Sequence, residues 1–372
     1  MKAISRSLPA CLLALASVSQ GAAPAPAELD EFFAPPAEYR GKLGEYRSPL
    51  RFDDGTPVRT AADWPRRREE ILRYWHQALG PWPPLIEKPR LEDLEGEREH
   101  VENFTRRKVE VEVAPGTLAG PNYLLVPDGQ GPFPAMVVTW YNSTDSAGLS
   151  EKARGTLDFG YQLAKRGFVA LCLGGLGEDP TRRIQPLSFL AYAAANSCRA
   201  LSAMAEVDPG RIGIVGHSFG GKWAMLASCL HQGFACAVWI DPGIVWNEKD
   251  PNANYWEKWY LGYDFDRTAG QQREPGVPDA AHPRTGAYRK LLADGHDLHD
   301  LHALMAPRPF LVSGGAQDRP EHWIALNHAI AVNELLGQKG RVAMTMREGH
   351  TPTAESNEQV YAFLERFLKH RR

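Results

Sequence analysis

Apolar residues in the second half of the chain alternate between short unbroken runs and longer stretches with helical periodicity. The unbroken runs predict strands buried on both faces, at residues 134–141, 168–175, 211–218, 234–241, 308–315 and 341–349. Between them, apolar residues recur every three or four positions and predict helices at 155–167, 186–206, 220–232, 321–337 and 357–370. Strands alternating with helices indicate an α/β fold with a mostly parallel central sheet and helices on both of its faces.

The flanking segments suggest two additions to this alternating pattern. Residues 24–105 are mixed and contain one amphipathic helix that begins after Thr60 or Asp63 and ends at the GPWPP of residues 80–84. We expect this part to be an N-terminal extension packed on a main domain of residues 106–372. The alternation also breaks at 242–300, which is too long for a plain loop. It predicts a cap over the carboxyl ends of the strands, where open sheets place their sites.

The first residues have the pattern of a secretory signal peptide. Lys2 and Arg6 precede the apolar run LPACLLALASVS, and small residues follow up to Ala23. We therefore expect residues 1–23 to be cleaved and the mature protein to be secreted or periplasmic. No later run approaches the 18 apolar residues typical of a membrane-spanning helix, so none is predicted.

Composition narrows the classes of partner. The formal net charge is −3, whereas nucleic-acid-binding proteins typically carry an excess of basic residues, so nucleic acid is not expected as a partner. An oxidising compartment would permit disulfides, but the four cysteines beyond the signal peptide lie in apolar strand or helix patterns, and we favour buried free thiols. These cysteines are Cys172, Cys198, Cys229 and Cys236. No cofactor is predicted, and the sequence leaves the oligomeric state open.

The stretch GHSFGGKW, residues 216–223, fits two motifs that both occupy a strand–turn–helix. One is G-x-S-x-G, the tight turn that exposes a nucleophilic Ser218; the other is most of a phosphate-binding P-loop. A P-loop needs Ser or Thr after Lys222 to bind Mg²⁺, and this chain has Trp223 there. The nucleophile motif is therefore favoured.

A serine nucleophile needs a histidine base and an acid, in the chain order serine, acid, histidine. His350 ends the last predicted strand, and Asp318 directly follows the strand before it. We predict a Ser218–Asp318–His350 triad, with Asp241 as the alternative acid because it ends the strand before that of Asp318. The backbone N–H of Phe219 and a group near Tyr141 or Asn142 are expected to form the oxyanion hole.

Three segments resemble secreted bacterial carbohydrate esterases of the α/β-hydrolase superfamily: GHSFGGKWA, DLHDLHALMAPRPFLVSGG and REGHTP. The acetyl xylan esterase-like and glucuronoyl esterase-like groups are the most similar. The resemblance extends from about Gly131 to the C-terminus and implies an α/β-hydrolase fold and hydrolysis of esters on polysaccharides. It departs at Phe219, where glucuronoyl esterases carry an arginine that helps the oxyanion. This difference favours a simpler O-acetyl ester over a glucuronate ester. A peptidase of the prolyl oligopeptidase type and a non-catalytic carbohydrate-binding protein remain alternatives.

Residues near the predicted cleft are candidates for substrate contact. Aromatic faces in the cap could stack on sugar rings, and Arg182 could bind an anionic substituent. The aromatic candidates are Trp246, Trp256 and Trp259. His296, His299 and His302 are spaced three apart, which a metal site could use, but a polar helix face that packs through its leucines is the favoured explanation, and no metal is predicted.

Overall fold

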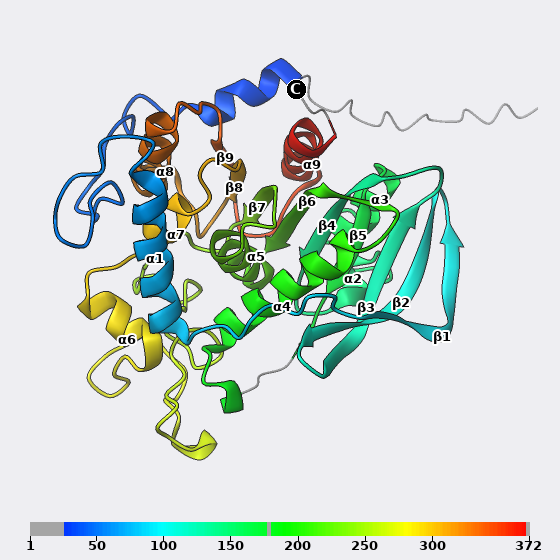
Figure 1. Cartoon of the computed structure of the whole chain (residues 1–372), viewed down its shortest axis with the longest axis horizontal. Helices are drawn as coiled ribbons and strands as arrows, with labels where there is room; N and C mark the ends of the chain where they lie inside the picture. Colours follow the sequence, from blue (N-terminus) through cyan, green and yellow to red (C-terminus); the bar gives the residue numbers. More distant parts are fainter. Residues whose placement is uncertain (1–25, 177–179, 370–372) are drawn as a thin grey trace, which may run out of the picture.

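The computed structural model describes residues 26–176 and 180–369, and it confirms the predicted α/β fold (Figure 1). A nine-stranded sheet has the order β1-β2-β3-β5-β4-β6-β7-β8-β9. The first three strands and the β3–β5 pair are antiparallel, whereas β5, β4 and β6 to β9 are parallel to one another. The strands are β1 Leu91–Val101, β2 Phe104–Ala114, β3 Thr117–Pro127, β4 Phe133–Thr139, β5 Val169–Leu173, β6 Val207–His217, β7 Cys236–Ile240, β8 Phe310–Gly314 and β9 Val342–Met346.

Helices cover both faces of the sheet because the central strands are apolar on both sides. On one face, α4 and α5 lie side by side in a core that also includes α1, α6, α7 and α8; α3 and α9 cover the other face. The helices are α1 Trp64–Leu79, α2 Ser143–Ser146, α3 Phe159–Lys165, α4 Pro186–Ser202, α5 Phe219–Leu230, α6 Gly286–Ala293, α7 His299–Ala303, α8 Trp323–Leu335 and α9 Ala354–Leu368. Short 3₁₀ turns occur at Pro26–Phe33, Pro180–Arg182, Ala269–Gln271 and Pro320–His322.

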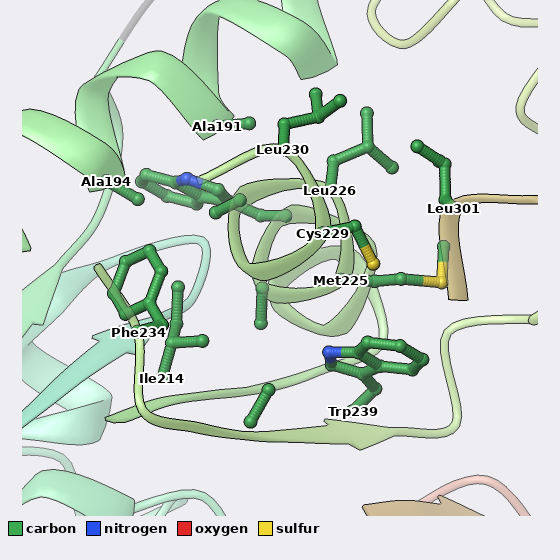
Figure 2. Close-up of a cluster of buried hydrophobic side chains, with 14 of the residues drawn as sticks. Ala191, Ala194, Ile214, Met225, Leu226, Cys229, Leu230, Phe234, Trp239 and Leu301 are labelled. Atoms are coloured by element: carbon green, nitrogen blue, oxygen red, sulfur yellow. The ribbon is translucent and has the colours of Figure 1, made fainter. Parts of the chain in front are cut away.

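Helix α5 is held at the centre of the larger core. Figure 2 shows Ile214 of β6 and Trp239 of β7 beneath this helix, with Leu301 of α7 on one side. The α5 side chains Met225 and Cys229 are fully buried on the side of the helix that faces Trp239 and Leu301. This packing fixes the first residues of α5, which directly follow Ser218.

The sheet begins earlier than the sequence suggested. The N-terminal extension predicted for residues 24–105 includes β1, which pairs with β2 and so belongs to the sheet. β1 is an edge strand whose residues are mostly charged, so it lacks the apolar pattern on which the prediction relied. The predicted helix is α1, which begins after Asp63 and ends at Gly80.

The predicted cap belongs to the long connection between β7 and β8. It contains α6, α7 and a 3₁₀ turn, and several of its aromatic side chains belong to the main core. The predicted signal peptide, residues 1–23, lies outside the described residues. Within the part of the chain that the structure describes, no helix has the length and apolar character needed to cross a membrane. The four cysteines predicted to be buried free thiols are free and buried.

Candidate active site

Ser218 lies in a sharp turn between β6 and α5, with φ of 54° and ψ of −114°. A positive φ is strained for a residue other than glycine, so the surrounding packing must impose it. Two neighbouring glycines make the turn possible. A Cβ on Gly216 would lie 2.2 Å from the carbonyl oxygen of Gly220, and a Cβ on Gly220 would lie 1.9 Å from that of Thr139. Ser218 therefore has the backbone geometry of the predicted nucleophile turn.

Because of this crowding, substitutions at the adjacent glycines Gly220 and Gly221 should differ strongly in their effect on stability. Gly220→Ala should destabilise the protein by about 3 kcal/mol, because the new methyl group collides with backbone that cannot move aside. Gly221→Ala is the matched control, since its Cβ would meet its nearest neighbours at 3.1 Å. We expect this control to change stability by about 1 kcal/mol or less, because alanine also favours the helix. Urea unfolding would measure both variants, and equal effects would contradict the geometry.

His350 lies beside this turn and pairs with Asp241. The Nδ1 atom of His350 is 2.6 Å from Oδ2 of Asp241, and the carboxylate is fully buried. Ser218 is brought to the same place because its backbone N–H donates to the carbonyl of Ile240, directly before Asp241. The His350 ring also contacts the ring of His217, with 4.6 Å between centroids. With Nδ1 engaged by Asp241, Nε2 is the nitrogen that remains for a substrate or a serine hydroxyl.

The structure corrects the predicted hydrogen-bond partner of His350, which is Asp241 and not Asp318. Asp318 accepts backbone N–H bonds from Gly243 at 2.9 Å and Ile244 at 2.6 Å, and its Oδ1 is 3.1 Å from Nδ1 of His322. Its own N–H donates to Oδ1 of Asp241 at 2.8 Å. Asp318 therefore supports the loop after β7 and the carboxylate of Asp241.

The predicted oxyanion hole lies at the first turn of α5. Phe219 is the first residue of this helix, where backbone N–H groups lack intrahelical partners. Tyr141, which follows β4, is 54% exposed and stacks on the Phe219 ring with 4.7 Å between centroids. The side chain of Asn142 instead caps α2 by accepting from the N–H of Asp145. The Tyr141 side chain thus lies against the first residue of α5, and the part of both residues in an oxyanion hole stays a prediction.

Comparison with known proteins agrees with the observed fold. Residues 139–363, more than half of the chain, match the model described as the alpha/beta hydrolase family. The chain belongs to the alpha/beta hydrolase family. A search of curated proteins finds no match.

Solved structures share the whole hydrolase fold at low sequence identity. A glucuronoyl esterase from Solibacter usitatus is 19% identical with a TM-score of 0.63, covering 90% of this chain and 100% of that one. A glucuronoyl esterase of carbohydrate esterase family 15 from Teredinibacter turnerae is 20% identical with a TM-score of 0.61, covering 86% and 88%. A Bacteroides fragilis protein provisionally named an acetyl xylan esterase is 15% identical with a TM-score of 0.56, covering 82% and 79%.

Lys222 of this hydrolase is a buried cation that faces inward. Its Nζ donates to the carbonyl oxygen of Pro242 at 2.5 Å and lies 4.8 Å from the centre of the Tyr255 ring. Burial lowers the pKa of Lys222 to about 8, against the nearby carboxylates of Asp318 and Asp241, which raise it. Lys222 thus connects α5 to the loop after Asp241. Its inward orientation gives no support to a P-loop, which the sequence already disfavoured.

The aromatic residues predicted to contact substrate lie in different environments. The prediction for Trp256 is wrong, because this side chain is 1% exposed and packs against Tyr288. Trp246 is half-buried, and its indole N–H donates to the carbonyl of His296. Trp259 is half-buried beside Tyr260. Sequence alone could not separate the core face of the cap from its open face, because both are aromatic.

The remaining residues singled out in the sequence are Arg182 and the three histidines. The guanidinium of Arg182 donates to Oγ1 of Thr117 at 3.4 Å, and its side chain is half-buried. Nδ1 of His296 lies 2.6 Å from Oδ2 of Asp300. The other two histidines, His299 and His302, are buried. Among the residues that the structure describes, no cluster of three or more His, Cys, Asp or Glu side chains could hold a metal ion.

Proposed function

We propose that this hydrolase is a serine esterase that removes ester substituents from polysaccharides, with Ser218 as nucleophile, His350 as base and Asp241 as acid. The observation that carries the proposal is the 2.6 Å contact between His350 and buried Asp241 beside the strained Ser218 turn. Asp241 replaces Asp318 in this role because of that contact.

The proposed reaction has two halves. Ser218 attacks the ester carbonyl while Nε2 of His350 takes its proton, and Asp241 stabilises the imidazolium that forms. The N–H groups of Phe219 and Tyr141 hold the oxyanion. The bond between the acyl carbon and the sugar oxygen then breaks, and His350 gives its proton to this oxygen, which leaves as a hydroxyl. A water that loses its proton to His350 attacks the acyl-enzyme and releases the free acid, and His350 returns this proton to the oxygen of Ser218.

The favoured substituent is an O-acetyl group. The side chain that follows the nucleophile, Phe219, is apolar and stacks on Tyr141, so it offers no charged donor to the oxyanion of a glucuronate ester. The nearby cations Lys222 and Arg347 are directed toward backbone carbonyls. The names of the structural neighbours, which include glucuronoyl esterases, keep the glucuronate ester as the second candidate.

One experiment separates these two candidates. The purified protein would be incubated with acetylated xylan and with methyl-glucuronate glycans, and the acetate and methanol released would be measured. We expect acetate release to dominate. Methanol release that exceeds it would favour the glucuronate ester, and release of neither would contradict the proposed esterase activity on both.

A substitution at Phe219 would test its part in selectivity. Phe219→Arg should raise kcat/KM on a methyl glucuronate ester by about tenfold, because a charged hydrogen bond to the oxyanion formed from this ester adds about 1.5 kcal/mol or more. Phe219→Met is the matched control, since it keeps an apolar side chain and should affect both substrates equally. The ratio of kcat/KM for the two substrates measures the effect. An unchanged ratio in Phe219→Arg would show that this position does not control selectivity.

A further inference from the structure

Arg347 is a buried arginine that binds the backbone around the proposed base. It follows β9 by one residue, and its side chain is only 4% exposed. Nη1 donates to the carbonyl oxygens of Ser313 at 2.9 Å and Gly314 at 3.0 Å, at the end of β8. Nη2 donates to the carbonyl of His350 at 2.5 Å, and Nε donates to that of Thr351 at 3.2 Å. One guanidinium therefore joins β8 to the turn that carries His350.

The same His350 carbonyl has a second side-chain partner. Nε2 of His217, the residue before Ser218, lies 3.0 Å from it. Burial, with a smaller contribution from the charge of His350, lowers the pKa of His217 to about 3. His217 is thus neutral at ordinary pH and has one N–H, which must be on Nε2 because a carbonyl can only accept. Its ring also stacks on Trp140, with 5.3 Å between centroids.

These contacts matter because the His350 ring is only partly enclosed by other side chains. Its side chain is 36% exposed, as a base that must reach substrate requires. Its orientation therefore depends on Asp241 and on the placement of its own backbone. A base displaced by about 1 Å can lose on the order of 10²-fold in rate.

We propose that Arg347 and His217 are positioning residues that fix the backbone of His350, so that its imidazole stays aligned with Asp241 and Ser218. This inference rests on the proposed function, because it assigns His350 as the base. Arg347 also places positive charge near the pair, since Nη2 lies 3.8 Å from Oδ2 of Asp241. Lysine could not replace it fully, because one ammonium cannot reach four carbonyls arranged around a planar fork.

Substitution of Arg347 would change the pH profile as well as the rate. Asp241, His217 and Arg347 contact His350, and two further charged groups, Asp318 and Lys222, act on Arg347 and on His217. Removal of the Arg347 cation takes a positive charge away from the His350–Asp241 pair, which favours the protonated form of the base. Since the base must be neutral, the acid limb of kcat/KM should move to higher pH.

The test compares Arg347→Met, Arg347→Lys and His217→Asn with the unaltered protein on an acetyl ester. We expect Arg347→Met to lower kcat about 10²-fold with little change in KM, and to move the acid limb upward by about half a pH unit. Arg347→Lys should lower kcat about tenfold without moving the limb, because the charge is kept. His217→Asn should also lower kcat, since it removes the second bond to the carbonyl.

Arg308→Met is the matched control. Arg308 is a half-buried arginine that likewise binds backbone, since it donates to the carbonyls of His231, Phe234 and Leu304 at the opposite end of β8. It should lower the melting temperature but leave kcat and the pH limb unchanged. Melting curves would be recorded for all variants. If Arg347→Met does not fold, Arg347→Lys and His217→Asn decide the outcome.

Two failures can be told apart. An unaltered protein that neither hydrolyses esters nor reacts with a fluorophosphonate overturns the proposed function itself. The positioning role alone is overturned if the unaltered protein is active but the Arg347 and His217 variants keep its kcat and its acid limb. They would then behave as the Arg308→Met control should.

Discussion

Ser218→Ala is expected to lower kcat on an acetyl ester by about 10⁶-fold, because the variant has no oxygen with which to form an acyl-enzyme. Activity above the background reaction would come only from binding and from the oxyanion hole. The loss should be in kcat, with KM nearly unchanged, since the hydroxyl contributes little to substrate binding. Acetate release under saturating substrate measures it.

The matched control is Ser202→Ala, at an exposed serine near the end of α4. It should keep full activity. A fluorophosphonate should label the unaltered protein and Ser202→Ala, but not Ser218→Ala. Full activity in Ser218→Ala would contradict the proposed mechanism. Absence of labelling in the unaltered protein would favour a non-catalytic carbohydrate-binding protein of the same fold.

Asp241→Asn is expected to lower kcat by about 10⁴-fold. Nδ1 of His350 donates to Oδ2 of Asp241, which keeps the proton on Nδ1 and leaves Nε2 free to accept a proton from Ser218. An amide in this place can present its NH₂ group to Nδ1, which favours the opposite tautomer, and it no longer stabilises the imidazolium. The variant should fold, because asparagine keeps the volume. Its kcat and its reaction rate with a fluorophosphonate would measure the loss.

Asp318→Asn separates the two candidate acids. Asp318 accepts from two backbone N–H groups, of Gly243 and Ile244, so the amide would weaken the loop after β7. We expect a lower melting temperature and a loss in kcat of about tenfold, far below that of Asp241→Asn. A larger loss in Asp318→Asn than in Asp241→Asn would return the acid role to Asp318.

Local features of the sequence were enough to predict the fold and the nucleophile turn. Parallel strands buried on both faces must be apolar throughout, so β4 to β9 could be recognised from unbroken apolar runs. Gly216 and Gly220 are required where a Cβ would collide with backbone, and this requirement is written into the motif around Ser218. The order of motif residues along the chain similarly placed His350 after the last strand.

Only the tertiary structure decided between groups that are equivalent in the sequence. Asp241 and Asp318 both follow strands, and the sequence favoured Asp318. The folded chain places Asp241 against His350 and turns Asp318 toward two backbone N–H groups. Arg347 was not singled out at all, because its four carbonyl partners are brought together only when β8 and β9 pair.

The tertiary structure also decided which aromatic side chains are buried. Trp256 and Trp259 lie three residues apart in one aromatic stretch, yet the first is buried in the core and the second is half-buried. β1 was missed because an edge strand needs only one neighbour and few apolar residues. The sequence by itself thus determined the α/β architecture and the strained turn at Ser218, since both depend on residue types at short spacing. The partner of His350, the support of its backbone and the exposed face of the cap were set by the three-dimensional packing of segments distant in the chain.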